Sequence, residues 1–277
     1  MALRPRRTLV IVTVVAWLGL GLSAAYAYLH NYDLHRGFTP LTTPSGVARG
    51  RIETVRFYAP SVRRRNSYLV YLPPHYASEA RRGRHFPVMY LLHGSPGTMN
   101  SFINIDSIDV RANVMIARHK MRPMILVMPG GEQGLGGDTE WANAEAGRWS
   151  DFVMDVVHDV DRRFATRPHR RYRALAGVSE GAYGALNIGL HHLRDFSVVE
   201  SWSGYFTQTP TGPFLHASPA LLDANSPADY VPALAPEIHR LGLRAWLLQG
   251  QTDWRSPALF RDFAHELHAA GAEVRYG

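Results

Sequence analysis

The chain has 277 residues, of which 46% are hydrophobic and 19% charged, and its formal net charge is +7. This composition is too apolar and too rich in aromatic residues for an intrinsically disordered protein. The sequence contains no cysteine, which excludes disulfides, thiolate metal sites and a cysteine nucleophile. The basic residues are nearly all arginines in short clusters without interleaved aromatic residues. We therefore interpret them as solvated surface charge and expect no binding to nucleic acid.

The N-terminal segment is apolar and uncharged over residues 8–29, and three arginines lie within the seven residues before it. About 20 apolar residues in a helix span the roughly 30 Å hydrocarbon core of a membrane. We therefore expect residues 1–29 to be a single-pass membrane anchor, with the rest of the chain outside the cytoplasm. The alternative is a signal peptide cleaved near Ala27, where the sequence fits an A-x-A site. Residues 30–50 are polar, with proline, glycine and threonine, and indicate a linker.

From residue 51 onward, short apolar runs alternate with helical patterns. Alternating polarity predicts half-buried strands at 54–58 and 67–72, and continuous apolar runs predict buried strands at 87–92 and 124–128. The later predicted elements are a helix at 150–164, a strand at 172–176, a helix at 182–191, strands at 197–202 and 244–248, a helix at 258–270 and a strand at 272–276.

This order predicts an α/β fold for residues 51–277, with a mostly parallel central sheet and helices on both faces. Residues 205–237 are rich in proline, serine, threonine and alanine and interrupt the alternation of strands and helices. They are a candidate cap over the carboxyl ends of the strands, where α/β sheets bind ligands.

A nucleophile motif is predicted at Ser179. Residues 177–181 read G-x-S-x-G, between a predicted strand and a predicted helix. In that context the serine lies on a sharp turn that exposes its hydroxyl, and glycines are needed because side chains beside the turn would collide. A plain tight turn with a capping serine is the alternative reading.

A nucleophilic serine also needs an oxyanion hole, a base and an acid. The backbone N–H groups of Glu180 and Ser95 are the expected oxyanion donors, since Ser95 follows the strand at 87–92 and Pro96 has no N–H. His93 is expected to line the site as a structural loop residue. Asp253 follows the strand at 244–248 and is the candidate acid, with a turn or capping aspartate as the alternative.

With these motifs the sequence resembles the esterase D-like family of α/β-hydrolases, which includes feruloyl esterases, S-formylglutathione hydrolase and the antigen 85 mycolyltransferases. The resemblance runs from about Ser67 to the C-terminus. The matching blocks are YLVYLPPHY at 68–76, PVMYLLHG at 87–94, WSDFV at 149–153, RALAGVSEGAYGALN at 173–187 and SWSGY at 201–205.

The resemblance implies that Ser179 is the nucleophile, Asp253 the triad acid, and Ser95 and Glu180 the oxyanion donors. It also places Trp141 and Asn143 near the active site, and Tyr205 is a further candidate for the pocket lining. The family more often has methionine at position 180, so the Glu180 carboxylate predicts either slower chemistry or selection of a cationic substrate.

The resemblance also implies a histidine base in a Gly-Gly-His-x-Trp-like segment about thirty residues beyond Asp253. The sequence ends at Gly277, and its histidines after Asp253 are His265 and His268, both on the predicted helix before the last strand. Three readings stay open: a chain that continues further, a non-catalytic relative, or a histidine from elsewhere, such as His216.

We therefore expect a serine carboxylic-ester hydrolase that acts on a small-molecule or lipid ester and needs no metal or organic cofactor. Acyl transfer by the same nucleophile and a non-catalytic binding protein are the two alternatives. The aspartates at 151, 155 and 159 lie one helical turn apart and are interpreted as a solvated helix face.

Overall fold

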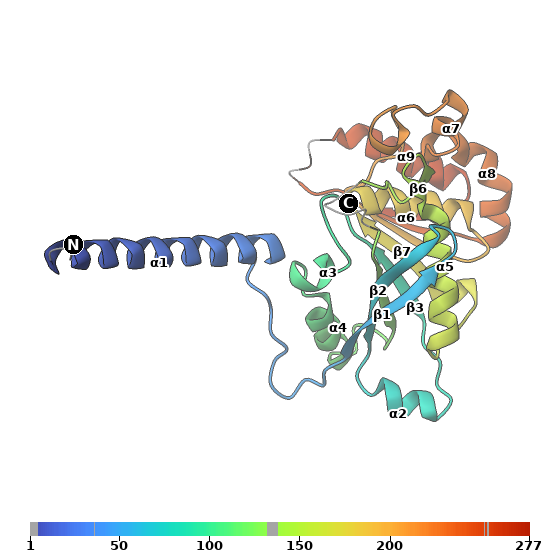
Figure 1. Cartoon of the computed structure of the whole chain (residues 1–277). Coiled ribbons are helices and arrows are strands. Elements are labelled where there is room, and N and C mark those ends of the chain that lie inside the picture. The colour runs from blue at the N-terminus through green and yellow to red at the C-terminus, as the bar shows by residue number, and fades with distance from the viewer. Residues whose placement is uncertain (1–4, 36, 132–137, 252, 254) are drawn as a thin grey trace.

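The computed structural model describes residues 5–35, 37–131, 138–251, 253 and 255–277. A central sheet carries helices on both of its faces, and one long N-terminal helix projects away from it (Figure 1). The fold predicted for residues 51–277 is therefore confirmed.

The main sheet has eight strands in the order β1-β2-β4-β3-β7-β8-β9-β10. Strands β1 and β2 are antiparallel to their neighbours, and all pairs from β4 to β10 are parallel. A two-stranded ribbon, β5 (Asn143–Ala144) with β6 (Gly147–Arg148), stands apart from the main sheet. The strands of the main sheet are β1 (Arg51–Ala59), β2 (Arg64–Leu72), β3 (Val88–Leu92), β4 (Ile125–Pro129), β7 (Arg173–Val178), β8 (Val198–Trp202), β9 (Arg244–Leu248) and β10 (Glu273–Tyr276).

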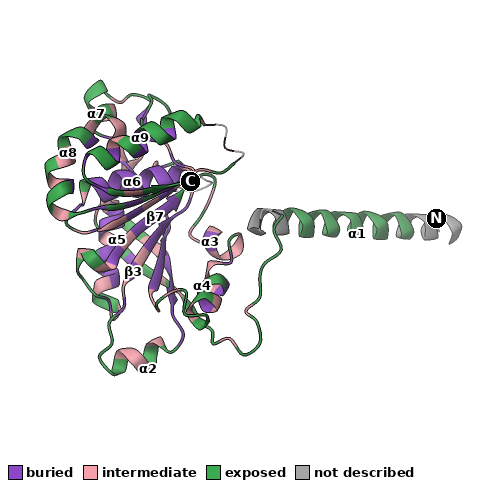
Figure 2. Cartoon of the chain, turned by 180° about the vertical axis from the view of Figure 1, so that it is seen from behind, coloured by how far each residue is buried: buried purple, intermediate pink, exposed green. Residues whose placement is uncertain are grey.

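The helices divide between the two faces of this sheet (Figures 1 and 2). Helices α3 (Ser101–Asn104) and α4 (Ile108–Ala117) pack on one face. The opposite face is covered by α5 (Trp149–Arg163), α6 (Glu180–His191), α8 (Pro227–Leu241) and α9 (Pro257–Ala269). Two short helices, α2 (Tyr76–Arg81) and α7 (Pro219–Asp223), lie at opposite ends of the molecule.

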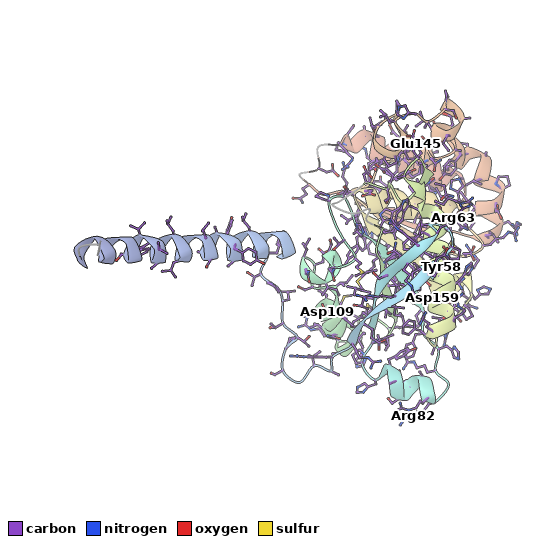
Figure 3. All side chains as sticks on the ribbon, in the orientation of Figure 1. Tyr58, Arg63, Arg82, Asp109, Glu145 and Asp159 are labelled. Atoms are coloured by element: carbon purple, nitrogen blue, oxygen red, sulfur yellow. The ribbon has the colours of Figure 1, made fainter. Side chains whose placement is uncertain are left out.

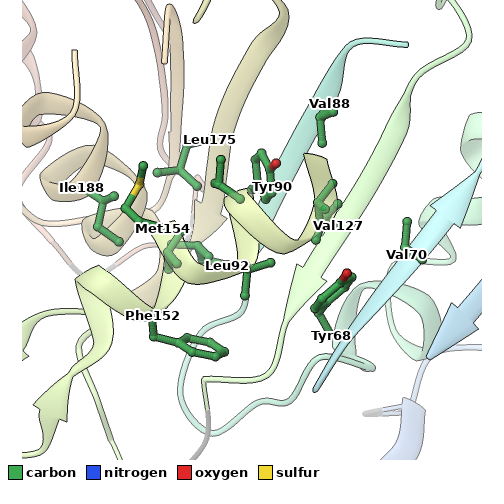
Figure 4. Packing of buried hydrophobic residues seen from close by; sticks show 14 of the residues in the cluster. Tyr68, Val70, Val88, Tyr90, Leu92, Val127, Phe152, Met154, Leu175 and Ile188 are labelled. Carbon is green, nitrogen blue, oxygen red and sulfur yellow. The ribbon is translucent and has the colours of Figure 1, made fainter. Parts of the chain in front are cut away.

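Alternation along the central strands builds both layers of core. In β2, Tyr68 and Val70 point to the α5–α6 side, whereas Leu69 and Tyr71 point to the α3–α4 side. The side chains at alternate positions of β3 and β4 divide in the same way, so that each face receives an apolar layer. Figure 4 shows the layer on the α5–α6 side. This double burial explains why both strands read in the sequence as unbroken apolar runs.

Helix α1 (Pro5–His35) extends beyond the predicted boundary at residue 29 and takes up the first residues of the predicted linker. The described side chains of α1, residues 13–29, are exposed (Figure 2). Among the residues that the structure describes, no helix combines the length and the apolar character that crossing a membrane requires. The membrane anchor and the cleavable signal therefore both stay predictions.

The segment after α1 is fastened to α4 by hydrogen bonds. The Leu41 N–H donates to Ser107 Oγ at 3.1 Å, and the Gly50 N–H donates to Asn113 Oδ1 at 2.8 Å. The Asn113 amide also donates to Thr43 Oγ1 at 3.2 Å. Residues 41–50 thus run along the domain as an ordered strap on the α3–α4 side.

The candidate cap at 205–237 is divided between two roles. Residues 205–209 and 211 border a cleft at the carboxyl ends of the parallel strands. The end of the region belongs to α8, whose Val231 and Ile238 are buried against the core. This helix covers the sheet face and does not form part of a lid.

Candidate active site

Ser179 occupies the sharp turn that joins β7 to α6. Its backbone has φ 56° and ψ −117°, a conformation that side-chain-bearing residues rarely adopt. The turn is held by the Ser179 N–H, which donates to the Trp202 carbonyl at 2.9 Å, and by the Ser179 carbonyl, which accepts from the Ala182 N–H at 3.0 Å. The predicted strand, turn and helix around the G-x-S-x-G motif are all present.

The two glycines of the motif allow three backbone segments to meet behind the nucleophile. A Cβ at Gly177 would overlap the Gly181 carbonyl and lie 2.8 Å from the Leu92 carbonyl oxygen. A Cβ at Gly181 would overlap the same Leu92 carbonyl. Because both contacts are with backbone, no rotation of a neighbouring side chain would make room for a larger residue.

The predicted oxyanion donors lie beside Ser179. Glu180 is the first residue of α6, so its N–H has no acceptor within the helix, and the positive end of the helix dipole lies here. The loop that carries Ser95 packs against the turn, because a Cβ at Gly94 would lie 3.1 Å from Ser179 Cβ. Ser95, Ser179 and Glu180 all line one cleft.

The cleft has a volume of about 980 Å³ and two chemically different walls. The apolar wall combines Phe206 with Leu259, Phe260 and Phe263 of α9. Phe206 stacks on Phe263 with ring centroids 4.0 Å apart. The rest of the lining is mainly polar, and we call its part formed by Asp138, Glu140, Glu180, Thr207, Gln208, Thr209 and Thr211 the polar, acidic wall; α9 adds the carboxylates of Asp262 and Glu266.

The acidic wall contains one buried carboxyl group, Glu180, and one half-buried carboxyl group, Glu140, both with shifted pKa values. Glu180 is 6% exposed, and its Oε1 accepts from the Thr139 N–H at 3.2 Å and the Thr139 hydroxyl at 3.3 Å. Burial, followed by the nearby charges of Asp138 and Glu140, raises the pKa of Glu180 to about 8. Burial likewise raises the pKa of Glu140 to about 7, although hydrogen bonds from Tyr205 and other neighbours oppose the shift.

Asp253 follows β9, as predicted, and is held by its own loop. Its side chain is 5% exposed. Its Oδ1 accepts from the Arg255 N–H at 3.0 Å and from Arg255 Nη1 at 3.1 Å. Burial by itself would raise the pKa of Asp253, but the hydrogen bonds from Arg255 and Ser203 and the Arg255 charge hold it below its ordinary value. The carboxylate is therefore kept ionised beside the cleft.

Of the four residues predicted to line the substrate site, the structure places Tyr205 in the cleft. Its ring stacks on Tyr183 with centroids 5.0 Å apart, and its hydroxyl donates to Glu140. The prediction for His93 and Trp141 is corrected. His93 is 4% exposed and Trp141 fully buried, their rings meet edge to face, and the Trp141 indole N–H donates to the His93 carbonyl at 3.0 Å.

Asn143 also lies outside the cleft lining. Its side-chain amide donates to Asp151 Oδ1 at 2.9 Å and thereby ties β5 to the start of α5. Trp141 and Asn143 follow Glu140 within three residues in the chain. They therefore affect the cleft only indirectly, by holding the segment next to Glu140 in place.

No histidine lines the cleft within the described residues. His216, the candidate substitute base, is exposed and pairs with Glu145 at 3.1 Å, on the outer surface near α7 (Figure 3). His265 and His268 lie on α9, where the His268 ring faces the Ala272 carbonyl. The described part of the chain also holds no group of three or more His, Asp or Glu side chains arranged to bind a metal ion.

Sequence reasoning did not identify Glu140, Gln208 and Arg255 as cleft residues. Glu140 accepts a hydrogen bond from Gln208 Nε2 at 3.2 Å, and the Arg255 guanidinium lies 5.5 Å from the centre of the Tyr205 ring. The only local signal was the charge of Glu140 and Arg255 next to predicted site residues.

Comparison with known proteins finds relatives among esterases. An esterase of Mycobacterium tuberculosis is 31% identical over 137 residues, which are 49% of this chain and 28% of that protein. An endo-1,4-beta-xylanase/feruloyl esterase of Xylanibacter ruminicola is 26% identical over 163 residues, which are 57% of this chain and 22% of that protein. The chain thus matches about a quarter of the length of these curated relatives.

Solved structures share the fold at low sequence identity. A ferulic acid esterase superposes with a TM-score of 0.67 at 19% identity, covering 83% of this chain and 90% of that one. A fluorophosphonate-binding serine hydrolase of Staphylococcus aureus superposes with a TM-score of 0.68 at 16% identity, covering 83% and 91%. The family model named Esterase, described as "Putative esterase", matches residues 59–258, and the chain therefore belongs to that family.

Proposed function

We propose that the protein hydrolyses carboxylic esters through an acyl-serine intermediate on Ser179. The observation that carries the proposal is the left-handed turn at Ser179, which lies between β7 and the N-terminus of α6 and borders the cleft. Membership of the esterase family and the likeness to esterase structures support the same class of reaction.

In the first half of the reaction, Ser179 Oγ attacks the ester carbonyl carbon and gives its proton to a base. The family resemblance assigns this base to a histidine after the last strand, which the ionised Asp253 would orient. The N–H groups of Ser95 and Glu180 donate to the carbonyl oxygen as it becomes negative. The C–O bond then breaks, and the alcohol leaves with the proton from the base.

In the second half, water gives a proton to the same base and attacks the acyl carbon. The bond to Ser179 Oγ breaks, the serine recovers its proton, and the carboxylic acid is released. The apolar wall formed by Phe206 and α9 suits the acyl group, and the polar wall suits the alcohol.

The test is covalent labelling by a fluorophosphonate, which reacts with an activated serine. We expect the full-length natural protein to be labelled and Ser179→Ala not to be. Ser256→Ala is the matched control, because Ser256 also lines the cleft but makes no capping hydrogen bond with its side chain. No labelling of the wild type would overturn the proposal and support a non-catalytic binding protein.

Acyl transfer to an alcohol is a second candidate, supported by the row of hydroxyls at Thr207, Thr209 and Thr211 along the polar wall. Such a row offers hydrogen bonds to an alcohol that competes with water for the acyl-enzyme. Adding glycerol or trehalose during turnover separates the two reactions. Transfer predicts an acylated acceptor, and hydrolysis predicts free acid alone.

We also propose that the N-terminal helix tethers the domain to a membrane with the cleft outside the cytoplasm. The uncharged apolar stretch at residues 8–29 and the arginines before it support this. Cell fractionation followed by N-terminal sequencing tests it: a soluble protein that begins after Ala27 would replace the tether with a cleaved signal.

A further inference from the structure

We propose that the ester hydrolysed in this cleft carries an organic cation in its alcohol part, held by Asp138, Glu140 and Glu180. This inference rests on the proposed function and names the substrate class for the same site. It follows from how the acidic wall is arranged beside the nucleophile and from the excess of carboxyl groups over basic groups among the described cleft residues.

The three carboxyl groups are gathered by the loop at 138–140 and by the first residue of α6. Asp138 Oδ1 accepts from the Glu140 N–H at 3.0 Å, and Thr139 between them donates twice to Glu180. The Glu180 side chain also forms a hydrogen bond with Asp138. A hydrogen bond between two carboxyl groups needs a proton on one of them, and a bound cation would favour loss of this proton by neutralising both carboxylates.

The protein supplies little positive charge to this wall. Within the described lining, five carboxyl groups face the cleft and Arg255 is its one basic side chain. Arg255 makes two hydrogen bonds to Asp253 through Nη1, at 3.1 and 3.2 Å, and lies over the Tyr205 ring. Its charge is therefore shared between Asp253 and the acidic wall, where it acts on Glu140, and the carboxyl groups of the wall outnumber it.

The nucleophile and the acidic wall are close enough to act on one substrate. Glu180 belongs to both, because its N–H is the oxyanion donor and its carboxyl group lies in the wall. The apolar wall on the other side of the cleft takes the acyl chain, which leaves the cation on the alcohol. A compact trialkylammonium group suits this place, since Tyr205 adds an aromatic ring beside the carboxylates.

Proton release accompanies this binding. Glu140 and Glu180 have pKa values of about 7 and 8, so much of each is neutral at pH 7. A cation favours their ionised forms, and the preference for a cationic ester therefore grows as the pH rises from about 6 to 9. The groups that face these two carboxyls are Asp138, Thr139, Tyr183, Tyr205, Gln208 and Arg255.

The experiment compares butyrylcholine with 3,3-dimethylbutyl butyrate, a neutral ester of the same shape. We expect the wild type to favour butyrylcholine by about 10- to 100-fold in kcat/KM at pH 8, the range expected when carboxylates and an aromatic ring face a cation in a partly desolvated site. Glu180→Gln and Glu140→Gln should each lower this ratio at least fivefold, and because both esters are measured on the same variant, any general loss of activity cancels in the ratio.

Glu145→Gln is the matched control, since Glu145 is an exposed carboxylate outside the cleft and should leave the ratio unchanged. A ratio near one in the wild type, or a ratio that neither variant lowers, overturns the inference while ester hydrolysis stands. If neither ester is hydrolysed, calorimetry with butyltrimethylammonium decides. Binding that Glu140→Gln weakens supports the cation site, and no binding by the wild type rejects it.

Discussion

Two buried tyrosines in neighbouring parts of the sheet are predicted to respond oppositely to loss of their hydroxyl groups. Tyr68 of β2 and Tyr90 of β3 are both fully buried in the same cluster (Figure 4). The Tyr68 hydroxyl donates to Asp159 Oδ2 of α5 at 2.9 Å, and that carboxylate also pairs with Arg162 and Arg163. Asp159, labelled in Figure 3, is thus buried and paired, so the expectation that it lies on a solvated helix face is wrong. The Tyr90 hydroxyl has no hydrogen-bond partner among the described residues.

Tyr68→Phe removes a hydrogen bond to a buried charge, which is worth about 1.5–3 kcal/mol. We expect a loss near the lower end, about 1.5 kcal/mol, because two arginines continue to satisfy Asp159. Tyr90→Phe removes a hydroxyl group whose burial without a hydrogen-bond partner costs about 1–3 kcal/mol of stability. Its edge-to-face contact with Phe196, centroids 6.1 Å apart, is kept, so we expect a gain of up to about 1 kcal/mol.

Urea unfolding followed by tryptophan fluorescence measures both changes. The free energies of unfolding of the two variants should differ by about 2 kcal/mol, with unchanged m values, so the midpoints should separate by roughly 1 M urea. The reasoning is refuted if Tyr90→Phe loses as much stability as Tyr68→Phe. In that case the Tyr90 hydroxyl would be satisfied in solution.

Three further predictions concern the site and its support. Gly184→Ala should lower stability by about 1–3 kcal/mol, because the new Cβ would lie 2.5 Å from Trp141 Cβ; an unchanged Tm would contradict this. Leu259→Arg should leave stability unchanged, since Leu259 is exposed, but should lower kcat/KM on p-nitrophenyl octanoate relative to the acetate by about tenfold, the worth of roughly two buried methylenes. The folded-state pKa of Asp253 lies below the unfolded value of about 3.9, so its charge stabilises the fold above about pH 4, and this contribution is lost as the pH falls through the folded-state pKa. Asp253→Asn should therefore lose less stability than the wild type between pH 6 and 3 in urea titrations, and an equal loss would count against the role given to Arg255.

The parts of the fold that depend on local pattern were predictable from the sequence. Strand β9 was predicted at 244–248 and is observed there, because its alternating residues face the core and solvent in turn. The turn at Ser179 follows from residues 177–181 alone, since the glycines and the serine act within one turn of chain. The predicted positions of Ser95 and Asp253 required one further rule, that the carboxyl ends of parallel strands meet at one edge.

Helix α8 was missed because its sequence contains two prolines in its interior, Pro232 and Pro236. Proline normally ends a helix, since it lacks an N–H and its ring crowds the preceding turn. Both prolines are exposed to solvent, whereas Val231 and Ile238 of the same helix are buried against the core. Tertiary burial thus overrides a local signal, which a single sequence does not reveal.

The misplaced and missed cleft residues depend on contacts between distant parts of the chain. Trp141 was expected in the pocket, but Gly131 and Gly184 leave space for its indole ring in the interior, since a Cβ at either glycine would overlap it. Glu140 reaches the cleft through partners more than sixty residues away, Tyr205 and Gln208. Neither arrangement leaves a periodic pattern in the sequence from which it could be predicted.

The strap along α4 sets how far the hydrolase domain can move from the N-terminal helix. Its hydrogen bonds begin at Leu41, and α1 ends at His35, so five residues separate the two. The step from His35 to Leu41 covers six residue spacings, which reach at most about 20–22 Å when fully extended. A structure that holds α1 therefore also holds the start of α4 within about this distance. The domain would then meet its substrate only close to the place where α1 is held.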